Sequence, residues 1–90
     1  VLFNRACGSS GEAIIVAFEE RPNTRSFGEP SCGVSTANTN FDLGDNYTLW
    51  LTVSTFADRA ENIYGGRIPP DEAIGDSDAL WTRVAEWFQE

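Results

Sequence analysis

The sequence predicts a mixed α/β domain, because helical and strand-like segments alternate along its 90 residues. A helix-start signal precedes the apolar run at residues 13–18, two strand-like runs flank Gly44-Asp45-Asn46, and an amphipathic segment closes the chain. Ninety residues make one small domain at most. The lack of Met and the apolar start at Val1 predict that residues 1–90 are a single fragment of a longer or processed polypeptide.

The first half of the chain is expected to form a strand, a helix and a second strand. Residues 1–4 are typical of a short buried strand. The Ile and Val residues within 9–20 suit a strand or a helix, but Ser9-Ser10-Gly11-Glu12 fits a capping box and therefore favours a helix over residues 9–20. Arg21-Pro22-Asn23 ends this helix, and residues 24–27 are expected to be a short strand that leads into a turn at 28–30.

The second half is expected to form a hairpin and a last helix. Residues 36–43 and 47–56 are strand-like, with turn residues at 44–46. Both faces of the second strand carry apolar groups, so we expect both to be covered, by the domain itself or by sequence outside it. Asp76-Ser77 caps a helix over residues 78–89. Its apolar stripe consists of Leu80, Val84, Trp87 and Phe88, widened by Trp81.

This stripe should be buried against the sheet or against a second chain. Because a truncated domain leaves apolar faces uncovered, we expect the isolated fragment to self-associate or to stay bound to the remainder of its catalytic domain.

Charge and composition restrict the function. Fourteen acidic residues face six arginines, which gives a net charge of −8 and argues against nucleic acid or an anionic membrane as a partner. No metal and no cofactor are expected. The chain has neither His nor Lys, the usual bases that activate a serine, so it should not perform serine chemistry alone.

The segment around Ser9 has the order strand, glycine, serine, helix. This order is typical of a nucleophile elbow, in which a tight turn exposes the hydroxyl and helix amides face a developing oxyanion. We therefore expect the Ser9 hydroxyl to lie at the surface of a cleft. The G-x-S-x-G pattern is nearly met, with Cys7 in place of the first glycine. The alternative from the residues alone is that Ser9 only caps the helix.

Five segments in order resemble the C-terminal processing peptidases, or tail-specific proteases, and within them the branch of the tricorn core and the nisin-resistance protease. They are ACGSSGEAIIVAF, NTRSFGEPSCGVSTAN, LWLTVSTFADR, YGGRIPPDE and SDALWTRVAEWF. The resemblance implies the C-terminal part of a serine peptidase catalytic domain, with a partial ClpP/crotonase-like core and a peptide or protein substrate. It also implies an extracytoplasmic setting.

The resemblance assigns roles to individual residues. Ser9 matches the nucleophile, the backbone amide of Ser10 an oxyanion donor, and Glu12 the elbow glutamate that caps the helix and orients the site. The active-site loop is represented by Gly28, Glu29, Pro30 and Gly33. Cys7 and Cys32 fall on the two neighbouring loops; they form either a disulfide or two buried free thiols.

The departures from the family pattern are equally informative. Val34 stands where the Ser-Lys branch has its lysine base, so the base is expected to be a histidine from upstream sequence. The elbow has Cys7-Gly8 where Thr-Ala is usual. Three alternatives stay open: a catalytically dead relative that binds peptides or other ligands, an unrelated binding module, and a different α/β hydrolase.

Overall fold

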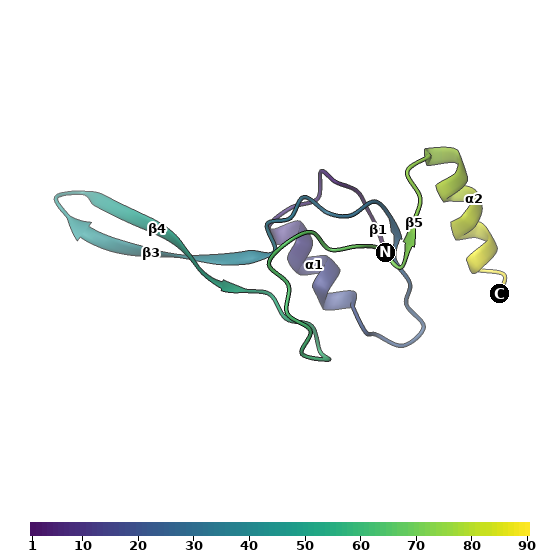
Figure 1. Ribbon diagram of the computed structural model, residues 1–90, viewed down its shortest axis with the longest axis horizontal. Helices are drawn as coiled ribbons and strands as arrows, with labels where there is room; N and C mark the ends of the chain where they lie inside the picture. Colours follow the sequence, from purple (N-terminus) through teal and green to yellow (C-terminus); the bar gives the residue numbers. More distant parts are fainter.

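The computed structural model describes residues 1–90, which form a small body and a long projecting hairpin (Figure 1). The element order is β1 (Leu2–Phe3), α1 (Ser10–Phe18), β2 (Phe27–Gly28), β3 (Thr36–Gly44), β4 (Tyr47–Thr55), β5 (Glu72–Ala73) and α2 (Ser77–Trp87). This order confirms the mixed α/β class. Neither helix is long and apolar enough to cross a membrane.

The body contains a parallel sheet of three short strands in the order β1-β2-β5. Its central strand begins at Phe27, so the expected strand over residues 24–27 is wrong in its position. Ser26 instead bonds the Asp71 carboxylate through its amide and its hydroxyl, at 2.8 and 3.1 Å. Gly28 has φ +137°, and a Cβ there would lie 1.9 Å from the carbonyl oxygen of Phe3, so only glycine fits between β1 and β2.

Helix α1 packs one face on the sheet and supplies half of a small core. Phe3, Ile15, Val16 and Ile68 form the buried apolar cluster. The helix ends at Phe18, two residues before the predicted end, because Glu19 is already extended with φ −62° and ψ 142°. The body therefore has few buried apolar side chains. Its hydrogen bonds and ion pairs must help to determine how its segments are arranged.

Strands β3 and β4 form an antiparallel hairpin at the predicted place, with irregularities in the pairing register between Ala37 and Asn38 and between Asp42 and Gly44. Asp45 and Asn46 join them with φ +51° and +67°, the left-handed pair that a type I′ turn requires. Phe41 lies opposite Leu49, so these side chains share one apolar face.

The body does not cover the hairpin. Of the two expected sources of cover, the domain itself and sequence outside it, the first is therefore wrong. Every residue of β4 is exposed, and the hairpin projects away from the sheet and both helices (Figure 1). The radius of gyration is 16.3 Å, against about 12 Å for a compact chain of this length. Residues 1–90 therefore leave the apolar face of the hairpin exposed to water.

Helix α2 begins at Ser77, where the Asp76 side chain accepts a hydrogen bond from the amide of Ala79 at 2.8 Å. No residue of α2 is fully buried: Leu80, Val84 and Trp87 are half-buried, and Phe88, which follows the helix, is 76% exposed. The sheet therefore covers the expected apolar stripe only in part. The physical reason is that the sheet offers only two-residue strands to pack on. Trp87 does reach Phe27 of β2, with ring centroids 6.0 Å apart.

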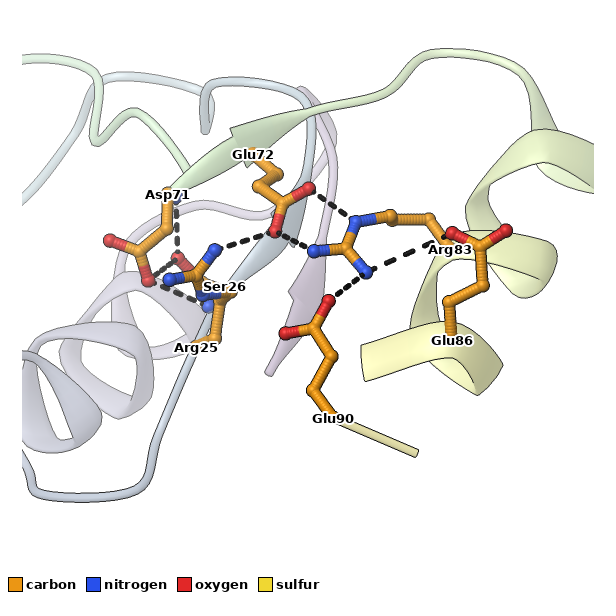
Figure 2. A network of polar contacts seen from close by, with 7 residues as sticks. All are labelled: Arg25, Ser26, Asp71, Glu72, Arg83, Glu86 and Glu90. Carbon is orange, nitrogen blue, oxygen red and sulfur yellow. Dashed lines mark hydrogen bonds and ion pairs between the residues drawn. The ribbon is translucent and has the colours of Figure 1, made fainter. Parts of the chain in front are cut away.

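An ion-pair network attaches α2 to the sheet (Figure 2). Glu72 of β5 binds Arg83 of α2 through both carboxylate oxygens, at 2.8 and 3.0 Å, and Arg25 at 2.8 Å. Arg83 also binds Glu90 at 2.9 Å. Arg83 and then Arg25 lower the pKa of the Glu72 carboxyl. The ion pairs of Glu72 and Arg83 therefore help to hold α2 on the sheet, together with the contact between Trp87 and Phe27.

Candidate active site

Ser9 lies at the N-terminus of α1 as the elbow pattern predicts. Its backbone has φ 54° and ψ −116°, a conformation that is uncommon for a residue with a side chain. The residue is exposed, and its carbonyl accepts the first hydrogen bond of the helix, from Ala13 at 3.1 Å. Strained backbone of this kind is characteristic of functional sites, where the surrounding contacts must hold it.

The Ser10 amide follows directly at the start of the helix. It donates no hydrogen bond within residues 1–90, as is usual for the first amides of a helix. It is therefore available to an acceptor beside the Ser9 hydroxyl, and the partial positive charge of the helix N-terminus favours a negative one.

Glu12 is the buried group that holds the elbow in place. Its side chain is fully buried, and its Oε1 atom accepts hydrogen bonds from the amides of Ser9 at 3.0 Å and Val34 at 2.9 Å. Oε2 accepts from the Ser31 hydroxyl at 2.6 Å and from the Gly33 amide at 3.2 Å. Burial by itself raises the pKa of Glu12, but these hydrogen bonds, that of Ser31 first, outweigh it and hold the pKa below its ordinary value.

The Glu12 carboxylate therefore joins the predicted elbow to the predicted loop. The expected capping-box contact at Ser9 is present, but three of the four donors come from residues 31–34. A buried carboxylate that accepts several backbone hydrogen bonds is stable as an anion. One ionised side chain thus fixes two segments that are distant in sequence.

The loop that follows β2 is anchored from its other side by the segment at 67–68. The Ser31 hydroxyl accepts from the Ile68 amide at 2.8 Å, and the Ser31 carbonyl accepts from Arg67 Nε at 2.8 Å. Arg67 also reaches the Pro30 carbonyl at 3.2 Å. Gly33 has φ +106°, and a Cβ there would come within 2.9 Å of the Arg67 side chain, so the loop's last position requires glycine.

Sequence reasoning did not identify Ser31 and Arg67 as parts of this arrangement. Ser31 is fully buried and bonds both Glu12 and Ile68. Its position inside the predicted loop was the only available signal. Glu29 and Pro30, which were predicted for the same loop, are only partly buried and do not contact Glu12.

Val34 and Gly8 lie against each other beside Ser9. A Cβ on Gly8 would be 3.1 Å from Val34 Cγ2 and 3.2 Å from the Cβ atom of Cys32. Val34 is 45% exposed. Val34, the residue expected to match the lysine base of the Ser-Lys branch, is therefore an apolar side chain close to the elbow.

Cys7 and Cys32 are free thiols, not a disulfide. Their loops are adjacent, since the Cys32 amide donates to the Cys7 carbonyl at 2.8 Å. The side chains diverge, however: Cys7 packs on the apolar core and over Gly11, whereas Cys32 is exposed and faces Gly8. Burial, with a smaller effect of Glu12, raises the pKa of the Cys7 thiol. The expectation that both thiols are buried is wrong for Cys32, which is exposed, and Cys7 is only partly buried.

The surroundings of Ser9 are open. None of the four cavities of residues 1–90 is lined by Ser9, so the expected cleft beside its hydroxyl is absent from this chain. No cluster of three or more His, Cys, Asp or Glu side chains is arranged to hold a metal ion. Ser9 is therefore exposed, and residues 1–90 do not enclose it.

The sequence matches the family model named Peptidase family S41 over residues 1–74. The chain belongs to peptidase family S41. The match includes the elbow, the loop and the hairpin, so the S41 assignment rests on all the elements that meet at Glu12 as well as on β3 and β4.

Two known proteins show how the S41 segment relates to longer chains. A nisin-resistance protein of Lactococcus lactis subsp. lactis is 41% identical over 64 residues, which are 71% of this chain and 20% of that protein. The solved structure of a lipoprotein from Streptococcus agalactiae matches with a TM-score of 0.80 and 29% identity, over 98% of this chain and 30% of that chain. The chain therefore spans less than a third of either relative's length.

Proposed function

We propose that this S41 chain is the nucleophile-bearing part of a serine endopeptidase, with Ser9 attacking the carbonyl carbon of a peptide bond. The observation that carries the proposal is the backbone of Ser9, which is held with positive φ at the start of α1 by a buried carboxylate. A residue that only caps a helix needs no such strain, because an ordinary N-cap has extended backbone angles.

The proposed mechanism uses three groups of this chain. The Ser9 hydroxyl forms the acyl bond, and the Ser10 amide donates to the oxyanion of the tetrahedral intermediate. Glu12 is a positioning residue: it fixes the Ser9 amide and the Val34 amide on one oxygen and therefore sets the distance between elbow and loop. No proton transfer is assigned to Glu12, because its carboxylate is buried, fully bonded and more acidic than usual.

The general base is proposed to come from outside residues 1–90. The chain contains neither His nor Lys, and Val34 cannot accept a proton. A histidine from another part of a longer S41 protein is the group that fits, since neutral imidazole accepts the serine proton and returns it to the leaving amine.

That same remainder of the catalytic domain is proposed to cover the apolar hairpin face and Phe88, which follows α2 and is 76% exposed. The argument is one of length: the solved neighbour shares the fold of 98% of this chain within a chain of which the match is only 30%. Its name as a lipoprotein, together with the nisin-resistance relative, supports an extracytoplasmic or membrane-attached location.

A second candidate is a catalytically dead relative that binds peptides or other ligands. The specific observation in its favour is that Val34 occupies the place of a lysine base and no other base is present in residues 1–90.

Labelling of the full-length protein with a fluorophosphonate separates the two candidates. An active peptidase should be labelled at Ser9, and Ser9→Ala should abolish the label. Ser54→Ala, which changes an exposed hairpin serine, is the control and should keep it. A full-length protein that is folded but is not labelled would favour the dead relative.

A further inference from the structure

A groove of about 310 Å³ lies at one end of the parallel sheet. Asn4, Glu29 and Ile74 line it, and each is the residue directly after β1, β2 or β5. Its other wall is the first part of α2, with Leu80 and Trp81. In open α/β sheets, ligands bind at the carboxyl ends of the parallel strands, so the groove is at the end of the sheet where a ligand is expected.

The groove carries two unpartnered groups that attract a cation. The Glu29 carboxylate forms no ion pair, since all four ion pairs of the chain involve other residues. Trp81 is 61% exposed, and its ring has neither an aromatic nor a cationic partner. No arginine lines the groove. A carboxylate and an exposed indole ring that line the same groove are groups that recognise an ammonium or guanidinium group.

We propose that this groove binds a basic side chain, arginine or lysine, of an extended peptide. The apolar residues of the groove, among them Phe3 and Leu80, suit the methylene stem of such a side chain. The net charge of −8 attracts a basic peptide at longer range. This inference rests on the proposed peptidase function only for the statement that the bound peptide is a substrate.

The groove is close enough to the elbow to serve the same peptide. Asn4 precedes Ser9 by five residues, so their Cα atoms are separated by at most about 18 Å. An extended peptide with its reacting bond at Ser9 can therefore reach the Asn4 edge of the groove within about five residues of that bond. The groove would then favour substrates with a basic residue a short way from the cleavage position.

The test is a binding titration of the 90-residue chain, which needs no catalytic base. The probe is a capped pentapeptide with a central arginine among alanines, and the comparison peptide has citrulline, its neutral isostere, at the centre. At low salt we expect the arginine peptide to bind at least about fivefold more tightly. Glu29→Gln should abolish this difference, and Trp81→Leu should reduce it.

Two matched variants control for nonspecific loss of charge or apolar surface. Glu61→Gln removes an exposed carboxylate outside the groove, and Trp50→Leu removes a hairpin tryptophan that is 66% exposed, similar to Trp81. Both should keep the preference for arginine. If Trp81→Leu unfolds α2, as seen by circular dichroism, Trp81→Phe replaces it; this variant keeps an aromatic face and should keep part of the preference.

Equal binding of the arginine and citrulline peptides would refute the proposal, and so would an equal loss in the control variants. The outcome is independent of the labelling of Ser9. If Ser9 is labelled but arginine is not preferred, the groove proposal is wrong and the peptidase proposal stands. If arginine is preferred but Ser9 is not labelled, the groove proposal stands and the peptidase proposal is wrong.

Discussion

Replacement of Glu12 by glutamine tests whether one carboxylate holds the elbow and the loop together. Both oxygens of Glu12 accept two hydrogen bonds, so an amide nitrogen at either position faces at least one donor. The Ser31 hydroxyl can rotate and accept instead, so glutamine should place its nitrogen near Ser31 and Gly33. The Gly33 amide then loses its acceptor, and the other bonds lose their charge assistance.

The expected cost of Glu12→Gln is about 2–4 kcal/mol, because a buried unsatisfied donor costs about 1–3 kcal/mol and charged hydrogen bonds are stronger than neutral ones. The assay is thermal or urea unfolding followed by circular dichroism, in which this loss corresponds to a fall of roughly 8–30 °C in Tm. Glu61→Gln, at an exposed site, is the matched control and should stay within about 0.5 kcal/mol of the parent chain.

The pH dependence of this difference provides a second measurement. The pKa of Glu12 is lowered on folding, so its contribution is complete above the ordinary pKa of about 4.5 and is lost as the pH falls through the lowered value. The stability gap between the parent chain and Glu12→Gln should therefore be constant near neutral pH and shrink below about pH 4.5. A gap below 0.5 kcal/mol at pH 7, or one that is unchanged in acid, would refute the reasoning.

Four further outcomes follow from the same structure. The isolated chain should show no peptidase activity above background, since it has no His and no Lys; turnover that Ser9→Ala abolishes would contradict this. Gly28→Ala should prevent or severely weaken folding, because its Cβ would lie 1.9 Å from the Phe3 carbonyl oxygen, which unfolding curves can measure. Glu72→Gln should loosen α2, seen as faster amide hydrogen exchange in residues 77–87 but not in α1. The isolated chain should self-associate in sedimentation experiments and bind a hydrophobic dye, because the apolar hairpin face is exposed. Phe41→Thr should reduce both effects. A compact monomer that binds no dye would count against an uncovered hairpin.

Local chemistry made several elements predictable from the sequence. The turn at Asp45-Asn46 and the cap at Asp76 depend on a few neighbouring residues, and both are found where expected. The elbow serine was predictable for the same reason, since the order of glycine, serine and helix is contained in a short segment. These features depend on hydrogen bonds that reach at most a few residues along the chain.

Features that depend on distant contacts were not predictable in the same way. The strand expected over residues 24–27 is displaced because Asp71 binds Ser26 across 45 residues of sequence. The direction of the Cys7 side chain follows from core packing, which periodicity in a short loop does not reveal. The exposure of the hairpin could not be decided either, because apolar residues on both faces indicate coverage without saying which part of a protein supplies it.

Glu12 also explains how a chain with so small a core can hold an unusual serine. The strain of positive φ at Ser9 must be offset by contacts that the elbow cannot make by itself. The Glu12 carboxylate supplies these contacts. Its Oε1 atom accepts hydrogen bonds from the amides of Ser9 and Val34. Its Oε2 atom accepts from the Ser31 hydroxyl, which in turn accepts from the Ile68 amide. The geometry of Ser9 is therefore fixed from inside this chain, whereas the proposed general base would come from outside it. In the proposed mechanism, the groups that position Ser9 are thus separate from the group that moves its proton. Changes at Ser31 or Glu12 should therefore act first on the stability of the elbow, and through it on any chemistry at Ser9.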